Sequence, residues 1–503
     1  MMSIASLLQQ TAKKFSEKIA LEFEEQQITF NDLDQTANRI ANAYHSLGIL
    51  KGDRVAHFTS TSPELIFSLL ANFKNGSIIV PVNAQFKGYE LLHILNDSGA
   101  KAIVTDNERL PLIRSIQSQL PHLREIILMG GKEGGTHSLD ELIRESFSTR
   151  TSTAINDEDI AAIFYTSGTT GKPKGVALTN HNITSNLEIL KKVWQWSPDD
   201  VLLHTLQLNH VHGFGIALCG SLMVGNKIIL RKKFDAKDVL ETIQQKRVTL
   251  FMGVPTMYFK LLEEKKEQHD LTSMRLFISG SAPLSKELFH RFSEAFGFEI
   301  LERAGMSETM INFSNPVDGK RMPGSVGFPL PTVQARIVND QLQDQPLNAE
   351  GEIVLKGENV FHGYWNNFLA NSESFCNGWF LTGDIGKMDE AGYVYIEGRK
   401  KDVIKSGGIL IFPKEIEEVI ETMPGVKECA VIGVADEIFG EAIKACVVID
   451  CETLSPEALI SFCKHHLASF KKPKHVEFFE TLPKNAMGKI LKEELRKSHS
   501  QGG

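Results

Sequence analysis

The first part of the chain alternates between two hydrophobic patterns. Apolar residues recur at helical spacing between Leu33 and Ala41, and Asn31 can cap the helix that they predict. Residues 77–82 and 102–104 are instead short apolar runs, which are typical of buried strands. Helices that alternate with buried strands in this way predict a mainly parallel sheet covered by helices.

A different arrangement begins after a short polar stretch at residues 397–402. Pro413 can start a helix at its first position, and apolar residues follow at helical spacing as far as Met423. This mixture of helix and strand patterns has the size of a small domain. We therefore expect two domains, residues 1–398 and residues 399–503. Strand patterns in the second domain lie at 429–434, 445–449 and 476–479.

Composition limits the classes of function that the chain can have. A length of 503 residues is too great for one hydrophobic core, which also favours at least two domains. The net charge of −8 argues against a nucleic-acid-binding protein, because such proteins usually carry a basic face. The six cysteines include no CxxC pair, so they indicate neither a zinc site nor a disulfide framework. No apolar stretch near the N-terminus is long enough to span a membrane, so we expect a cytoplasmic protein without stable membrane insertion.

The most informative stretch is a glycine-rich loop at residues 165–175, which follows an apolar strand pattern at 160–164. Its glycines let the backbone approach an anion closely, its serine and threonines supply hydroxyl donors, and Lys172 and Lys174 add positive charge. A Walker A loop needs Ser or Thr after the lysine and then a helix, whereas Pro173 follows Lys172 and a strand pattern comes next. The loop therefore predicts a phosphate site that is not that of a P-loop kinase.

The loop resembles the signature of the adenylate-forming superfamily, which includes acyl-CoA synthetases, luciferases and peptide-synthetase adenylation domains. Further motifs of this superfamily occur in the same order, so the resemblance covers nearly the whole chain. Several independent motifs in register are far more specific than any one of them. These motifs lie at residues 279–284, 382–384, 398–399, 405–408 and 483–489.

The resemblance implies a large α/β N-terminal domain, in which helices cover parallel sheets and a smaller β subdomain follows. A small, mobile α+β domain would complete the chain. The implied enzyme is an ATP-dependent acid–CoA ligase, which converts a carboxylic acid into its acyl-adenylate and then passes the acyl group to coenzyme A. It would use ATP, Mg²⁺ and coenzyme A, and it would release AMP and pyrophosphate.

The resemblance also assigns roles in the nucleotide site. Glu308 would hold Mg²⁺ by hard oxygen ligation, unless it is a surface glutamate. Asp384 would bind the ribose hydroxyls and Arg399 would support ribose or phosphate, unless they are a turn residue and a linker charge. Thr166 would take part in catalysis from the phosphate loop. The other implied nucleotide-binding positions are Ser167, Gly168, Thr169, Thr170, Gly171, Lys172, Lys174, Gly280, Ser281, Ala282, Ala304, Gly305, Met306, Ser307, Lys405, Gly407 and Gly408.

Lys489, near the C-terminus, is the implied catalytic lysine. In the enzymes that the chain resembles, this lysine approaches the α-phosphate and the attacking carboxylate during adenylation, a task that suits a compact cation. The small domain would then swing about the hinge residue Lys401 into a second pose that forms the thioester. In that pose Gly407 and Gly408 would line the pantetheine tunnel, where glycines leave room for a thin chain.

Narrower motifs around His210, Arg303 and residues 315–331 resemble those of malonyl-CoA synthetases. A buried Arg303 guanidinium could pair with the second carboxylate of a short diacid, unless it makes a structural salt bridge. His210 and Met306 would also contact the acid. His210 and His212 are expected to pack and gate rather than to bind a metal, because no carboxylate or cysteine accompanies them at ligand spacing.

One departure from the family pattern affects the substrate hypothesis. Ala304 stands where the family usually has an aromatic residue near the adenine, so the pocket could be wider or the nucleotide more weakly bound. Malonate or a related short diacid is the first hypothesis, and a medium- or long-chain fatty acid is the alternative.

Other functions remain open at this stage. The acceptor could be the thiol of a carrier protein, and oxidative luciferase chemistry uses the same adenylation residues. A non-enzyme alternative is a catalytically silent nucleotide-binding regulatory protein, against which the presence of Lys489, Glu308, Asp384 and Arg399 argues. The sequence does not predict the oligomeric state.

Overall fold

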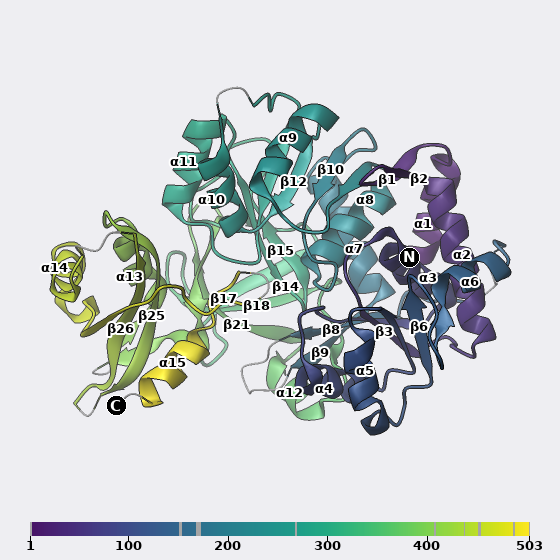
Figure 1. Ribbon diagram of the computed structural model, residues 1–503. Coiled ribbons are helices and arrows are strands. Elements are labelled where there is room, and N and C mark those ends of the chain that lie inside the picture. The colour runs from purple at the N-terminus through teal and green to yellow at the C-terminus, as the bar shows by residue number, and fades with distance from the viewer. Residues whose placement is uncertain are drawn as a thin grey trace.

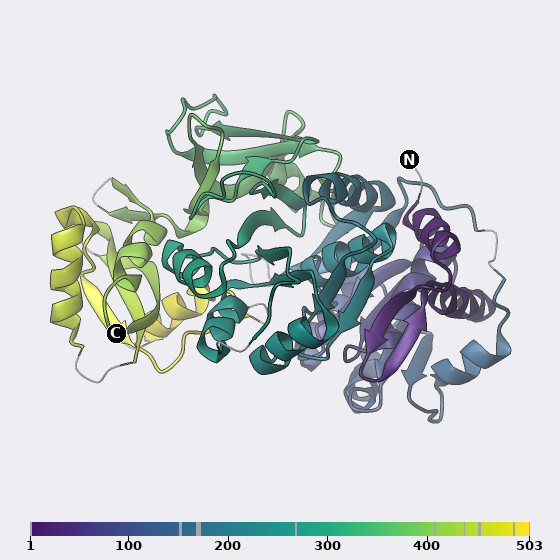
Figure 2. The ribbon, with the colours of Figure 1, turned by 90° about the horizontal axis from the view of Figure 1, so that it is seen from above.

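The computed structural model of the protein describes residues 3–149, 153–166, 173–266, 269–406, 409–436, 438–450, 454–485 and 488–501. Figure 1 shows a large α/β body with the C-terminal residues forming a separate lobe at its side. Seen from above in Figure 2, this lobe lies at the end of the molecule opposite the N-terminal helices.

The first sheet forms the lower part of the large body in Figure 1. Its central strands are parallel, as predicted, and the predicted strands at 77–82 and 102–104 are observed at 78–81 and 102–106. The strand after the predicted phosphate loop folds back antiparallel on the strand before it. In the described residues this sheet has eight strands, in the order β19 (Gly363–Tyr364), β9 (Lys174–Thr179), β8 (Ile160–Thr166), β4 (Ile78–Pro81), β3 (Arg54–Phe58), β5 (Ala102–Asp106), β6 (Glu125–Met129) and β7 (His137–Ser138).

The second sheet is parallel along its centre and antiparallel at both ends. Its last parallel strand, β14, continues into the antiparallel partner β15 through a tight turn that becomes important for the site. Within the described part of the chain it has nine strands, in the order β16 (Phe328–Pro329), β15 (Met310–Ser314), β14 (Leu301–Met306), β13 (Leu276–Ser279), β12 (Leu250–Gly253), β10 (Val201–His204), β11 (Lys227–Leu230), β1 (Ile19–Phe23) and β2 (Gln26–Thr29).

Helices cover both sheets, and one continuous core of buried apolar side chains joins them. Leu33, Ala37, Ile40 and Ala41 of the predicted helix all lie in this core. These helices are α1 (Ile4–Lys14), α2 (Phe30–Ser46), α3 (Pro63–Asn75), α4 (Gly88–Ser98), α5 (Leu110–Ile116), α6 (Leu139–Glu145), α7 (Asn180–Val193), the π-helix η2 (His212–Leu218), α8 (Cys219–Val224), α9 (Ala236–Lys246), α10 (Pro255–Glu264) and α11 (Lys286–Phe296).

The predicted cap of helix α2 is wrong by two residues. Thr29, not Asn31, precedes the first turn, and its Oγ1 accepts a hydrogen bond from the backbone N–H of Asp32 at 3.0 Å. The Asp32 carboxylate in turn accepts from the Thr29 backbone N–H, which completes a capping box. Asn31 lies inside the helix and bonds Gln35.

A smaller antiparallel sheet follows the large α/β body, as the resemblance implied. The short helix α12 (Phe368–Ser374) packs beside it. Among the described residues this sheet comprises β17 (Val333–Val338), β18 (Gly351–Gly357), β21 (Trp379–Met388), β20 (Phe375–Cys376) and β22 (Val394–Arg399).

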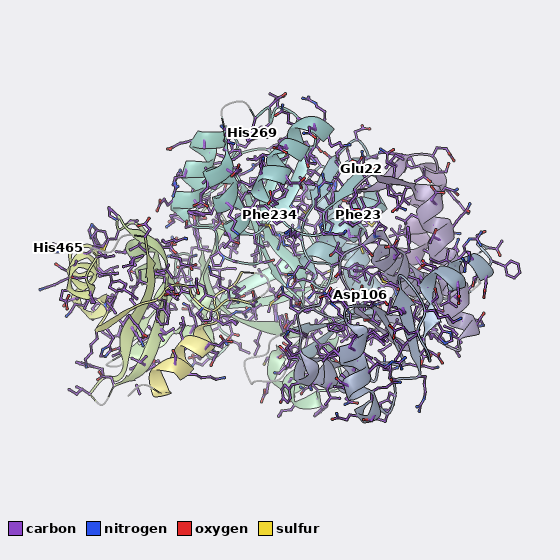
Figure 3. The ribbon with its side chains drawn as sticks, viewed as in Figure 1. Glu22, Phe23, Asp106, Phe234, His269 and His465 are labelled. Atoms are coloured by element: carbon purple, nitrogen blue, oxygen red, sulfur yellow. The ribbon has the colours of Figure 1, made fainter. Side chains whose placement is uncertain are left out.

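The C-terminal lobe is an α+β unit with cores of its own, because its buried apolar clusters draw on residues from Ile404 onward. Pro413 starts a helix at its first position, as predicted. His465, in the last turn of α14, marks the outer side of the lobe in Figure 3. The elements of the lobe are β23 (Ile404–Ser406), β24 (Ile409–Ile411), α13 (Pro413–Glu421), β25 (Val426–Asp436), β26 (Gly440–Ile449), α14 (Pro456–His466), β27 (His475–Phe478) and α15 (Lys492–Gln501).

Polar contacts hold the lobe against the large body in this arrangement, among them two pairs that involve helices α11 and α13. Lys286 of α11 pairs with Glu418 of α13 at 3.2 Å, and Lys414 Nζ donates to the Ile396 carbonyl oxygen at 2.6 Å. No helix in the described residues has both the length and the apolar character needed to cross a membrane.

Asn186 of α7 fixes strand β15, on which the site depends. Its side-chain amide donates to the Ile311 carbonyl oxygen at 2.8 Å and accepts from the Ile311 N–H at 3.3 Å, and both residues are buried. We expect Asn186→Ala to lower the free energy of unfolding by about 2–4 kcal/mol, because it leaves two buried backbone groups without this partner. Urea unfolding followed by circular dichroism measures the loss. Asn96→Ala, which removes an exposed amide bond, should change it by less than about 0.5 kcal/mol.

Candidate active site

The turn between β14 and β15 places Glu308. A Cβ atom on Gly305 would lie 1.7 Å from the Met310 carbonyl oxygen, so the turn closes this tightly only with glycine at 305. Glu308 is buried, and its backbone carbonyl accepts from Phe361 N–H at 2.8 Å. The Tyr364 hydroxyl donates to Glu308 Oε1 at 2.9 Å. Glu308 is therefore not a surface glutamate.

Glu308 has the surroundings of a ligand for a hard cation. Burial raises the pKa of its carboxyl group, the Asp384 charge raises it further, and the Tyr364 hydrogen bond and Arg399 oppose the rise. Within the described residues no group of three or more His, Cys, Asp or Glu side chains could hold a metal ion by itself. One buried carboxylate fits Mg²⁺ shared with substrate phosphates, which needs one or two protein carboxylates rather than a cage.

Asp384 and Arg399 face each other across neighbouring strands. They are register partners in β21 and β22, and Arg399 Nε lies 2.9 Å from Asp384 Oδ1. Arg399 Nη1 also donates to the Thr382 carbonyl oxygen at 2.8 Å, and Thr382 Oγ1 accepts from the Asp384 N–H. Burial raises the pKa of Asp384, whereas Arg399 and Lys489 lower it. The two residues therefore form an ion pair that is tied to the backbone of the smaller sheet.

Lys489 reaches this region from the C-terminal lobe. Desolvation lowers its pKa most, Arg399 lowers it further, and Asp384 and Asp402 oppose the fall. The residue as a whole is exposed to solvent in this arrangement. A Cβ on the preceding Gly488 would lie 3.3 Å from Thr256 Oγ1 at the start of α10, which shows how closely this loop approaches the large body.

The described residues at the two ends of the predicted phosphate loop are fixed by strand pairing and by contacts with helix α4. Thr166 and Lys174 are register partners in β8 and β9. The Tyr165 hydroxyl donates to Asp97 Oδ2 at 2.6 Å, and His93 Nε2 lies 2.9 Å from the Pro173 carbonyl oxygen. The predicted loop residues outside the described part of the chain are Ser167, Gly168, Thr169, Thr170, Gly171 and Lys172.

Arg303 lies in β14, before the turn that carries Glu308. Its side chain is 4% exposed, and its Nε and Nη2 have no hydrogen-bond partner among the described residues. The predicted alternative, a structural salt bridge, is absent from the described part of the structure. Gly280 makes the space, since a Cβ there would lie 2.5 Å from Arg303 Cζ. Burial lowers the pKa of Arg303 to about 9 and Tyr258 opposes the fall, so the group remains a cation at neutral pH.

Two histidines border Arg303 without adding charge. Burial and the Arg303 cation lower the pKa of His210 to about 4, and they lower that of His212 as well. His212 Nδ1 lies 3.1 Å from Ser281 Oγ, and His212 begins the π-helix η2, a kind of irregular turn that is frequent at functional sites. Both rings are neutral at pH 7, so Arg303 supplies the positive charge at this end.

The other predicted nucleotide-site positions of the large body lie in or near strand β14 and beside Ser281. Ala304 is opposite Phe313 in the β14–β15 ladder, Met306 packs half-buried against the main core, and Ser307 is buried in the turn. Ala282 follows Ser281 and is half-buried. By contrast, the described contacts of Lys401 and Lys405 are to other residues of the lobe. Lys401 is paired with Glu493, Lys405 lies in β23 with its N–H bonded to Glu441, and Gly407 and Gly408 are outside the described residues.

Sequence reasoning missed a residue that the structure brings to the site. Tyr364 contacts Glu308 from a separate strand pair. Tyr364 lies in a short strand whose partner is distant in sequence, so spacing gave no signal for it.

A protein-family model described as "AMP-binding enzyme" matches residues 8–365 of the chain. A second family model, described as "AMP-binding enzyme C-terminal domain", matches residues 415–489. A long-chain-fatty-acid–CoA ligase of Bacillus subtilis is 34% identical over 99% of this chain and 95% of that protein. A malonate–CoA ligase of Arabidopsis thaliana is 33% identical over 92% of this chain and 81% of that protein.

Solved structures are similar over almost the full length. ATP-bound MatB from Rhodopseudomonas palustris has a TM-score of 0.93 at 38% identity, with 99% of each chain covered. The apo structure of the same protein, at the same identity and coverage, has a TM-score of 0.80.

Glu302 generates a prediction about the pH dependence of stability. Burial raises its pKa from 4.5 to about 7, and Glu418 adds to the rise, while the Leu284 N–H and Lys414 oppose it. Between these pH values the folded protein holds a proton that the unfolded chain has released, so the free energy of unfolding falls as the pH rises. The whole decline amounts to about 3 kcal/mol.

Glu302→Gln removes this titration, and we expect its stability relative to the wild type to rise between pH 4.5 and pH 7. Urea unfolding across that pH range measures the difference in free energy of unfolding between the variant and the wild type. The other carboxyl groups are the same in both proteins, so their contributions cancel in this difference. Glu294→Gln, at an exposed position, is the matched control. Parallel profiles for wild type and Glu302→Gln would show that Glu302 does not titrate in this way.

Proposed function

The chain belongs to the AMP-binding enzyme family and is an AMP-forming acid–thiol ligase, and on this premise we propose that it joins malonate or a related short dicarboxylic acid to coenzyme A. The observation that carries the proposal is the buried Arg303 cation with two N–H groups that have no partner among the described residues. The malonate–CoA ligase among the relatives supports the same substrate class.

The energetic argument concerns the cost of this buried charge. A guanidinium removed from water is destabilising unless it is paired and hydrogen-bonded. The second carboxylate of a diacid supplies acceptors for both N–H groups in the bidentate geometry that arginine favours. A fatty acid leaves the guanidinium unpaired beside its chain. The site therefore gains more from a short diacid than from a monoacid.

At the nucleotide end the chain's residues position the reactants and neutralise charge. We assign Glu308 to hold Mg²⁺, Asp384 and Arg399 to hold the ribose, and Lys489 to balance the charge that develops at the α-phosphate. Mg²⁺, when bound, neutralises phosphate oxygens and helps pyrophosphate to leave. Thr166 and Lys174 stand at the described ends of the loop that receives the triphosphate.

The arrangement of the lobe fits the adenylating pose, because Lys489 lies beside Asp384 and Arg399. The higher similarity to the ATP-bound form of MatB supports this assignment. We propose that the lobe, residues 399–503, turns about Lys401 for the second step and presents Lys405, Gly407 and Gly408 to coenzyme A. The exposed, lightly paired Lys401 suits such a pivot.

A medium- or long-chain fatty acid is the second candidate. The long-chain ligase of Bacillus subtilis is comparably similar, and Ala304 offers more room than an aromatic residue would. The hypothesis of a catalytically silent regulatory protein is set aside, since the relatives that match nearly the whole chain are CoA ligases.

The function is tested by measuring AMP release with ATP, Mg²⁺, coenzyme A and a panel of acids. The panel contains malonate, methylmalonate, succinate, acetate, octanoate, palmitate and ferulate. We expect the highest kcat/KM with malonate or methylmalonate. A maximum with octanoate or palmitate would replace the diacid proposal by its alternative.

Arg303→Leu tests the specificity assignment. We expect kcat/KM for malonate to fall about 100-fold, because the second carboxylate loses its charge partner, whereas that for octanoate should change less than about threefold. The fold should survive, since the replacement removes a buried charge that has no ion-pair partner among the described residues. Arg124→Leu, at an exposed position, is the control. An unchanged ratio between the two acids would remove Arg303 from substrate recognition.

Lys489→Ala tests the division of labour between the two steps. We expect ATP–pyrophosphate exchange to fall at least about 100-fold, because the developing charge loses its cation. Thioester formation from supplied malonyl-adenylate should stay within about threefold, since the lobe has turned away in that step. Lys497→Ala, on the exposed side of α15, should leave both half-reactions unchanged. Equal loss in both half-reactions would contradict the assignment.

A further inference from the structure

Tyr364 joins two parts of the nucleotide end that come from distant segments of the chain. Its hydroxyl donates to Glu308 Oε1 at 2.9 Å, and its ring centroid lies 5.2 Å from the Nζ of Lys174. The hydroxyl therefore contacts the proposed metal ligand, while the ring contacts Lys174, the second lysine of the predicted phosphate loop. A single side chain thus links the two groups that would receive the metal and the triphosphate.

The position of Tyr364 is fixed by its backbone. Asn371 of α12 accepts from the Tyr364 N–H at 2.6 Å and donates to its carbonyl oxygen at 3.1 Å. A Cβ on Gly363 would lie 2.7 Å from Asn371 Oδ1, so glycine lets this clamp close. On the other side, β19 pairs with β9, the strand that begins with Lys174. Tyr364 is therefore placed by main-chain contacts that do not depend on Glu308.

We propose that Tyr364 is a positioning residue, which holds the Glu308 carboxylate through its hydroxyl and the Lys174 ammonium through its ring. The inference rests on the proposed role of Glu308 at Mg²⁺. A residue that hydrogen-bonds a metal-binding carboxylate orients it and so changes the affinity for the metal. An aromatic ring that contacts a lysine ammonium group holds that group in place and so changes the affinity for phosphates that bind to the lysine. The two contacts can consequently be separated by substitution.

Tyr364→Phe removes the hydroxyl and keeps the ring, whereas Tyr364→Leu removes both. We expect Tyr364→Phe to weaken Mn²⁺ binding about tenfold, measured by electron paramagnetic resonance in the presence of α,β-methylene-ATP. The KM for ATP at saturating Mg²⁺ should stay within about twofold for Tyr364→Phe and rise at least about fivefold for Tyr364→Leu. Thioester formation from supplied malonyl-adenylate should be unaffected in both.

Tyr393→Phe is the matched control, because it also removes the hydrogen bond of a tyrosine hydroxyl, to the Lys320 carbonyl oxygen. It should leave Mn²⁺ binding unchanged. A second control combines Tyr364→Phe with Glu308→Gln, where the tyrosine substitution should cause no additional loss of Mn²⁺ affinity if it acts through Glu308.

The inference is overturned if Tyr364→Phe binds Mn²⁺ as tightly as the wild type, if Tyr393→Phe loses as much affinity, or if the losses from Tyr364→Phe and Glu308→Gln add fully. It also fails if wild-type Mn²⁺ binding does not depend on Glu308. Failure of the proposed function looks different: the wild type would then release no AMP with any acid, while the Mn²⁺ measurements still decide the role of Tyr364.

Discussion

The close contact between Gly305 and the Met310 carbonyl oxygen is the constraint on which the rest of the site depends. It allows β14 to turn into β15 within a few residues, although the sheet is parallel up to that strand. The strand consequently carries Arg303 against Gly280 before the turn and Glu308 against Tyr364 in it. One short segment thereby spans the distance from the proposed acid pocket to the proposed metal.

Charges that the protein leaves incompletely paired mark the two ends of this segment. Arg303 has donors without acceptors in the described structure, and Glu308 is a carboxyl group whose pKa burial raises. Such groups are costly in an empty site and become favourable when a ligand of opposite charge arrives. In the proposed reaction a triphosphate, a divalent cation and a carboxylic acid meet in the site, which matches this distribution of charge.

The sequence predicted much of the fold, because the strands at residues 78–81 and 102–106 follow from apolar runs. Glu308, Asp384 and Arg399 each stand in a short motif, but these motifs are far apart in the chain, and the roles of the three residues stay predictions. The sequence could not predict Tyr364, whose contact with Glu308 depends on the pairing of two strands far apart in the chain. Nor could it show that Arg303 has no ion-pair partner among the described residues, since burial and pairing are properties of the packed structure. The cap of α2 was misplaced because Thr29 and Asn31 are both good caps, and the reciprocal bond with Asp32 decides between them.

The glycine at position 280 has a consequence for how the acid preference of such an enzyme can change. The Arg303 guanidinium occupies the volume in which any other residue at 280 would place its side chain. A methyl group at position 280, as in Gly280→Ala, would displace the Arg303 guanidinium without any substitution of the arginine itself. On the proposed role of Arg303, a substitution at position 280 therefore changes the acid preference by displacing the arginine instead of replacing it.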